Sequence, residues 1–129
     1  MPPIDQLQRP PLVYLERLQR QGIFTTGLLL EVSETPTRRQ YLADQIQATT
    51  NDVNAWRDEA LLLNLASFGP AEQTLFTQAG IVGLSDLLAL SLEDLEERLN
   101  RAARVLGVEP PARLRVEGWW EQAQTLQEE

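Results

Sequence analysis

The sequence predicts an all-α protein built from two related helical repeats of about four helices each, which share one core. Apolar residues recur at helical spacing along most of the 129 residues. Alternation of apolar and polar residues with a period of two is missing, and β-branched residues are sparse. A glycine-isoleucine pair, a leucine pair and a tryptophan also follow one another in both halves, which indicates a duplication.

The duplicated positions set the expected domain boundaries. Gly22-Ile23 recurs in the second half as Gly80-Ile81. Trp56 recurs as Trp119, and this longer offset places a five-residue insertion at residues 108–112. The other matches are Leu29-Leu30 with Leu87-Leu88, Ser33 with Ser91, Ala60 with Ala123 and Leu63 with Leu126. We therefore expect repeats at residues 1–66 and 67–129 that fold as one compact unit.

Helix-start and helix-stop residues divide the first repeat. Pro11 can open a helix that ends at Gly22, where glycine suits a left-handed cap. Thr49 with Asp52 at the third position after it resembles a capping box and begins the fourth helix. Between them we expect a short helix at 27–32 and a longer one that begins at Thr35-Pro36 and carries Tyr41, Leu42 and Ile46.

The second repeat follows the same scheme. Pro70 opens a helix that ends at Gly80, and Ser85 is the expected cap of a short helix. Ser91 caps a longer helix that ends at Gly107. The apolar stripe of that helix is Leu92, Leu95, Leu99, Ala102 and Leu106, and a last amphipathic helix is expected at 114–126.

The composition excludes most catalytic chemistry. Cysteine and histidine are absent and every basic side chain is an arginine, so thiolate nucleophiles, histidine bases and lysine Schiff bases are not available. Glu93 and Glu97 lie one turn apart, but helical di-iron sites also need histidine. We interpret this acidic cluster as a complement to the helix dipole. The chain is expected to be no enzyme and to bind no metal or cofactor.

Membrane and export signals are also missing from the sequence. No uninterrupted apolar stretch approaches the roughly 18 residues that a membrane span requires. The first part of the chain lacks the basic start and apolar block of a secretion signal. These observations predict a cytoplasmic protein without membrane insertion.

The segment 65–72, Leu-Ala-Ser-Phe-Gly-Pro-Ala-Glu, resembles a helix-hairpin-helix turn. In that family two glycines flank an apolar residue, and backbone N–H groups at the next helix start hold a nucleic-acid phosphate. Phe68 and Gly69 match this pattern, whereas Ser67 replaces the first glycine. Serine accepts the unusual backbone angles of that position less readily than glycine does. The turn is therefore a weak nucleic-acid candidate.

The wider pattern of paired hairpin-like units, Gly-Ile before a leucine pair and Trp-x-x-x-Ala helices is similar to an uncharacterised bacterial family, a domain of unknown function. The resemblance covers about residues 10–127. That family is helix-hairpin-helix-like and is met often in photosynthetic bacteria. It implies two tandem helix-hairpin-helix-like repeats and no particular reaction.

Charge argues against nucleic acid as the partner. Residues 58–97 contain eight acidic and no basic side chains, and this window includes the hairpin. The acidic and basic residues outside it cancel, so the net charge of −8 lies on the segment that would have to approach phosphates. We therefore do not expect nucleic acid to be the partner. The segment is either a binding surface for a basic protein or a feature that maintains solubility.

Two features indicate a protein partner instead. Trp120 follows the core residue Trp119, and adjacent helical residues point about 100° apart, so Trp120 is expected at the surface or at the edge of the core. Its alternative role is to cover the neighbouring repeat. The second feature is an arginine patch, formed by Arg98, Arg101, Arg104, Arg113 and Arg115. The patch could bind an acidic partner or form the i,i+4 ion pairs Asp94 with Arg98 and Glu97 with Arg101. The resulting hypothesis is a non-catalytic protein-interaction or assembly module, with nucleic-acid binding by the hairpin and the arginines as the alternative.

Overall fold

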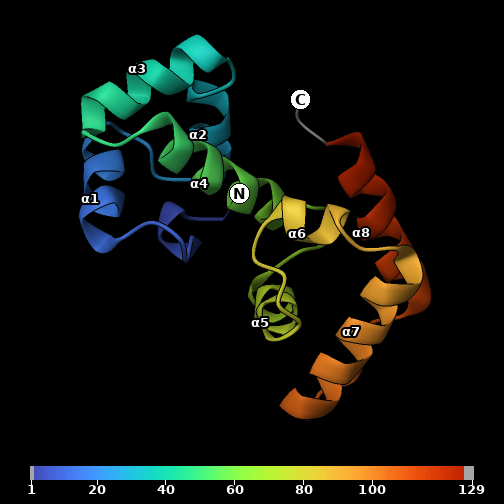
Figure 1. The fold of residues 1–129 in the computed structure, drawn as a ribbon. Coiled ribbons are helices and arrows are strands. Elements are labelled where there is room, and N and C mark those ends of the chain that lie inside the picture. The colour runs from blue at the N-terminus through green and yellow to red at the C-terminus, as the bar shows by residue number, and fades with distance from the viewer. Residues whose placement is uncertain (1, 127–129) are drawn as a thin grey trace. The chain divides into compact units, whose positions relative to one another are not determined.

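The computed structural model describes residues 2–126, which form helices and no strand, so the predicted all-α class is confirmed (Figure 1). One isolated β-bridge pairs Pro3 with Thr25. The described elements are the 3₁₀ turn η1 (Ile4–Gln6) and the helices α1 (Leu12–Arg20), α2 (Thr26–Val32), α3 (Pro36–Ile46), α4 (Thr50–Leu63), α5 (Pro70–Gln78), α6 (Leu84–Leu88), α7 (Leu92–Leu106) and α8 (Arg113–Thr125).

The chain divides into two compact units, Met1–Asn64 and Leu65–Glu129, which we call unit 1 and unit 2. This division lies slightly before the boundary after residue 66 that the sequence predicts. That the two units share one core stays a prediction.

Unit 1 is organised around α4, against which α2 and α3 pack, while α1 packs on α3. The apolar stripe of α4 is buried, with Trp56 3% exposed and Val53 and Ala60 fully covered. The predicted capping box is present: the Thr49 hydroxyl accepts the Asp52 N–H, and the Asp52 carboxylate accepts the Thr49 N–H. η1, for which the sequence offered no clear signal, buries Ile4 against this unit.

Unit 2 has the same scheme of contacts, since α6 and α7 pack against α8 and α5 packs on α7. Val116, Trp119 and Ala123 form the buried stripe of α8. In the register that aligns Trp56 with Trp119, they correspond to Val53, Trp56 and Ala60 of α4, and all six side chains are at most 3% exposed.

The turns that end the helices are also shared. Gly22 and Gly80 both adopt a left-handed φ of 81° after the first helix of their unit. Gln47 and Gly107 adopt left-handed φ values of 59° and 69° after the third. In each case the next N–H bonds back to the helix: Ile23 to Leu18, Ile81 to Phe76, Ala48 to Ala43 and Val108 to Ala103. These bonds align the first helices of the two units at Gly22 and Gly80, and the third helices at Gln47 and Gly107.

Three details of the sequence-based repeat are wrong. Ser85 lies inside α6, whose N-cap is Gly83, because the Asp86 carboxylate replaces a side-chain cap by accepting the N–H groups of Val82 and Gly83. Ser33 does not match Ser91: Ser33 is the buried C-cap of α2, whereas Ser91 is the N-cap of α7, as predicted. α7 is also longer than α3, so the extra residues are not confined to 108–112.

Candidate functional site

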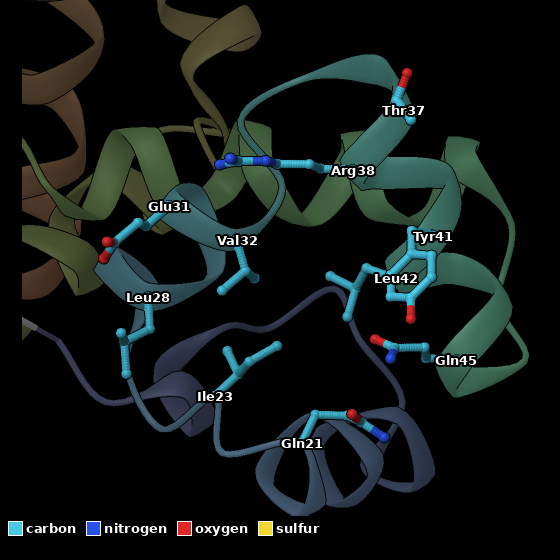
Figure 2. Close-up of a pocket in the computed structure, with 10 residues that line it drawn as sticks. All are labelled: Gln21, Ile23, Leu28, Glu31, Val32, Thr37, Arg38, Tyr41, Leu42 and Gln45. Atoms are coloured by element: carbon cyan, nitrogen blue, oxygen red, sulfur yellow. The ribbon is translucent and has the colours of Figure 1, made fainter.

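Unit 1 contains an apolar groove between α2 and α3, with a volume of about 590 Å³ (Figure 2). Ile23 and Leu42 form its floor and are each 4% exposed. In Figure 2 the side chains of Ile23, Val32 and Leu42 point into one common space. We call this site the α2–α3 groove. Its lining residues are Gln21, Ile23, Leu28, Glu31, Val32, Thr37, Arg38, Tyr41, Leu42 and Gln45.

The walls of the groove are apolar side chains that remain in contact with water. Leu28 is 37%, Val32 39% and Tyr41 67% exposed. Glu31 and Arg38 supply one negative and one positive charge at its border. Clustered exposed apolar side chains with a polar rim are typical of a binding surface. Sequence reasoning missed the groove, because it identified Tyr41 only as one of the apolar residues of its helix.

The predicted hairpin turn at residues 65–72 contains one left-handed residue, and a carboxylate of the chain lies at the start of the helix that follows it. Ser67 adopts the left-handed conformation with φ 57°, which a glycine would take in the family pattern. Gly69 is the N-cap of α5, and its N–H donates to the Glu72 carboxylate at 2.8 Å. Arg115 donates to the Ser67 carbonyl at 3.2 Å. A carboxylate of the chain thus occupies a position that a phosphate would take.

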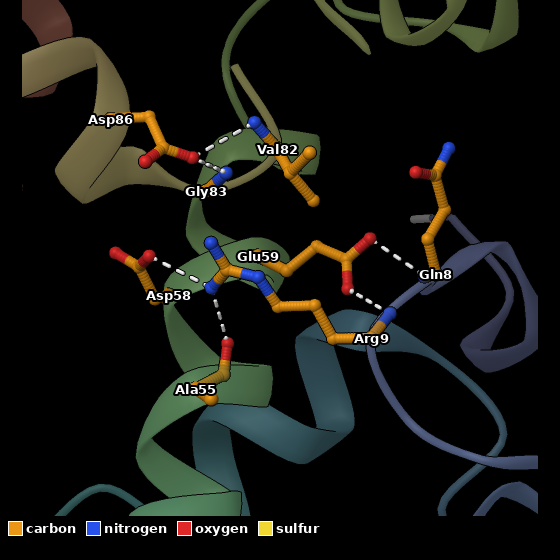
Figure 3. A network of polar contacts seen from close by, with 8 residues as sticks. All are labelled: Gln8, Arg9, Ala55, Asp58, Glu59, Val82, Gly83 and Asp86. Atoms are coloured by element: carbon orange, nitrogen blue, oxygen red, sulfur yellow. Dashed lines mark hydrogen bonds and ion pairs between the residues drawn. The ribbon is translucent and has the colours of Figure 1, made fainter. Parts of the chain in front are cut away.

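Two further helix starts are closed in the same way. Asp52 accepts the Thr49 N–H at the start of α4, and Asp86 accepts two N–H groups at the start of α6, as Figure 3 shows for Asp86. Each carboxylate neutralises the partial positive charge of its helix terminus. At each of these three helix starts, a phosphate would therefore have to approach or displace a side chain of the same sign.

The predicted arginine patch is spread over α7 and α8 of unit 2, and all five side chains are exposed. Arg101 pairs with Glu97 at 2.6 Å, as predicted, and Arg115 lies 3.7 Å from Glu72. Arg113 hydrogen-bonds Glu117 at 3.0 Å and lies 3.3 Å from Glu96, which raises its pKa. Among residues 2–126, Arg98 and Arg104 form no ion pair, so the expected Asp94–Arg98 pair is not formed. Within this patch, the charges of Arg98 and Arg104 are thus not compensated by an acidic side chain of the described residues.

Trp120 is half-buried, and its indole N–H donates to the Leu90 carbonyl at 3.1 Å. Its counterpart beside Trp56 is Arg57, which donates to the Leu30 carbonyl at 2.9 Å and to the Ser33 hydroxyl at 2.6 Å. Both side chains thus extend from the last helix of their unit to the end of the short helix. The indole of Trp120 thus ties together elements of its own unit, and both roles considered for it, a partner contact and cover for the neighbouring repeat, stay predictions.

A buried carboxylate fixes the start of unit 1 (Figure 3). Glu59 is 1% exposed and accepts the backbone N–H groups of Gln8 and Arg9 at 2.7 and 2.9 Å. Burial raises the pKa of Glu59, although the two hydrogen bonds act in the opposite direction. The Arg9 guanidinium contacts Asp58 at 2.9 Å and the Ala55 carbonyl at 2.8 Å. Sequence reasoning missed Glu59. Its signal was a charged residue three positions after Trp56, which places it at helical spacing on the buried stripe of α4.

The same clamp occurs in unit 2. Gln122 takes the place of Glu59 when Trp119 is aligned with Trp56, and it accepts the Ala66 N–H at 2.9 Å. Ala66 takes the place of Gln8 when Gly80 is aligned with Gly22. Both acceptors hold the segment that precedes the first helix of their unit. Both contacts therefore tie the start of a unit to its last helix.

Comparison with known proteins identifies the family. The model of a domain of unknown function, DUF4332, matches residues 12–126. The chain belongs to this family. No curated protein and no solved structure matches the chain. The described part of this DUF4332 chain also has no group of three or more acidic side chains placed to hold a metal ion. None of its described helices combines the length and apolar character that crossing a bilayer requires.

Proposed function

We propose that this DUF4332 protein is a non-catalytic protein-interaction module whose two units are tandem helix-hairpin-helix-like repeats. The observation that carries the proposal is the α2–α3 groove, where Leu28, Val32 and Tyr41 present apolar surface beside a closed core. The fitting occupant is the apolar face of an amphipathic helix from a partner protein. Charged groups on that helix would meet Glu31 and Arg38 at the rim.

The residues that border the groove do not support catalysis. Its charged side chains are one carboxylate and one guanidinium, and the other polar groups are amides and hydroxyls. A nucleophile there would have no histidine, cysteine or lysine to activate it, because the chain contains none. Recognition of an apolar surface needs no such group.

Val32→Asp and Tyr41→Asp are expected to reduce recovery of a specific partner at least about tenfold, because burying an unpaired charge costs more than about 1.4 kcal/mol. Both residues are exposed, so the far-UV circular dichroism of each variant should match that of the wild type. The measurement is affinity capture from the source organism with quantitative mass spectrometry.

Two control variants define the surface that binds. Leu114 is 81% exposed and lies outside the groove, so Leu114→Asp should leave recovery of the partner unchanged. Trp120→Ala tests the alternative contact surface formed by Trp120 and the arginine patch. If only Trp120→Ala loses the partner, the binding surface is the one formed by Trp120 and the arginine patch. If Val32→Asp and Tyr41→Asp recover the partner as well as the wild type does, the groove is not the binding site.

Nucleic-acid binding through the hairpin is the second candidate, supported by the left-handed Ser67 and by the uncompensated Arg98 and Arg104. Because Glu72 already accepts the Gly69 N–H, we expect labelled duplex and single strands to bind more weakly than about 100 µM even at low salt. Fluorescence anisotropy during a salt titration measures this. Glu72→Gln retains a hydrogen-bond acceptor but removes the charge and serves as the comparison. Micromolar, salt-sensitive binding by the wild type would favour this candidate instead.

A further inference from the structure

Unit 2 contains an open pocket of about 460 Å³ between α5, the end of α7 and α8. Trp119 and Leu75 form its base and are 3% and 7% exposed, while Leu106 and Val108 form a wall and are 36% and 52% exposed. The volume falls within the range of about 300–1,000 Å³ found for ligand sites. We call this site the Trp119 pocket.

The equivalent place in unit 1 is filled by the chain itself. Tyr14 of α1 packs on Trp56 with ring centroids 5.4 Å apart, and the Arg17 guanidinium lies 5.3 Å from the centre of the Tyr14 ring. The helix-end bonds align α1 with α5 at Gly22 and Gly80, and in this register Glu72 replaces Tyr14 and Leu75 replaces Arg17. The aromatic ring and the cation of unit 1 are therefore both missing from the corresponding sites of unit 2.

Hydrogen bonding differs between the two units in the same way. In unit 1 the Arg17 guanidinium donates to the Ile46 carbonyl at 3.0 Å, and the Tyr14 hydroxyl lies 3.4 Å from the Gln47 carbonyl. The matching carbonyls at the end of α7 belong to Leu106 and Gly107. Neither receives a side-chain hydrogen bond from residues 2–126. The end of α7, whose Leu106 lines the pocket, thus carries two acceptors at the negative end of a helix.

The side chain that replaces the tyrosine does not fill the pocket. Glu72 accepts the Gly69 N–H, so its carboxylate is directed to the start of its own helix. Arg115 lies 4.8 Å from the centre of the Trp119 ring and 3.7 Å from Glu72, which makes it a second wall. The partly exposed apolar surface between these walls has no occupant within residues 2–126.

We propose that the Trp119 pocket binds a tyrosine side chain of a partner protein that has an arginine or lysine close to it. The ring would pack against Leu75, Leu106 and Val108, its hydroxyl would donate to the Gly107 carbonyl, and the cation would approach the end of α7. Charge favours this partner, since residues 65–126 carry nine acidic and five basic side chains and Glu109 borders the pocket. The site is independent of the α2–α3 groove, so each can fail without the other.

Peptide titration followed by two-dimensional NMR of the full chain tests the proposal. The probes are the blocked peptides Lys-Gly-Tyr-Gly-Lys, Lys-Gly-Ala-Gly-Lys and Glu-Gly-Tyr-Gly-Glu. We expect the first to shift the methyl signals of Leu75, Leu106 and Val108 in a saturable manner. The alanine peptide and the acidic peptide should each bind at least about tenfold more weakly, equivalent to about 1.4 kcal/mol.

Two variants fill the pocket in different ways. Glu72→Tyr introduces the residue that unit 1 has at this place, and Val108→Trp closes the mouth while leaving the Glu72 cap intact. Both should abolish the shifts, whereas Val105→Trp, at a residue of α7 that is 67% exposed and does not line this pocket, should not. Equal binding of the alanine peptide, shifts confined to other surfaces, or unchanged binding by Val108→Trp would overturn the proposal.

Discussion

Replacing Trp119 with alanine is expected to lower the free energy of unfolding of unit 2 by about 3–5 kcal/mol. The ring is 3% exposed and meets Phe68 and Phe76 edge-on, with centroids 6.1 and 5.3 Å away. Its N–H donates to the Ala66 carbonyl at 2.9 Å. Truncation removes these contacts together and leaves a cavity between α5 and α8.

Hydrogen exchange of the amides in α5, α7 and α8 measures this loss for unit 2 alone. Trp120→Ala is the matched control, because it removes the same side chain from a half-buried position with one hydrogen bond to Leu90. That variant should cost about 1–2 kcal/mol. Similar losses in the two variants would show that Trp119 is not the principal anchor of this unit.

The helical class and many of the helix ends could be predicted because they depend on local signals. Prolines, capping threonines and glycines determine where helices begin and end, and the left-handed turns at Gly22, Gly80 and Gly107 follow directly from glycine. Tryptophan followed one turn later by alanine identified the buried stripe of α4 and α8, and Trp56 and Trp119 are both buried. Local signals are weaker where non-glycine residues take left-handed angles, as at Gln47 and Ser67.

The candidate sites could not be predicted because they depend on which faces remain uncovered. Tyr41 and Leu42 are neighbours on α3, yet Leu42 is 4% and Tyr41 67% exposed, since only one of them faces the core of unit 1. Trp120 was expected at the surface or at the edge of the core, and the position of Leu90 gives its N–H an internal acceptor that the sequence did not indicate. Such contacts join segments far apart in sequence, and spacing along one helix does not reveal them.

Replacing Glu59 with alanine is expected to lower the free energy of unfolding of unit 1 by about 2–4 kcal/mol at neutral pH. The carboxylate is 1% exposed and accepts the N–H groups of Gln8 and Arg9. Its removal leaves two donors without an acceptor and detaches the segment that carries Ile4 and Leu7 into the core. Urea unfolding followed by circular dichroism measures the loss, and Glu59→Gln, which keeps one acceptor oxygen, should lose less than half as much.

The pH dependence separates the carboxylate from its hydrogen bonds. Because burial raises the pKa of Glu59 above its unfolded value of 4.5, the folded chain binds a proton more readily than the unfolded chain does. The contribution of Glu59 to stability is therefore largest below pH 4.5 and declines as the pH rises through the folded pKa. Glu59→Gln lacks this titration. The free energy of unfolding of the wild type should therefore rise relative to that of Glu59→Gln as the pH falls. A difference that is constant with pH, or that shifts toward the variant on acidification, would mean that the two N–H donors outweigh desolvation at this buried carboxylate.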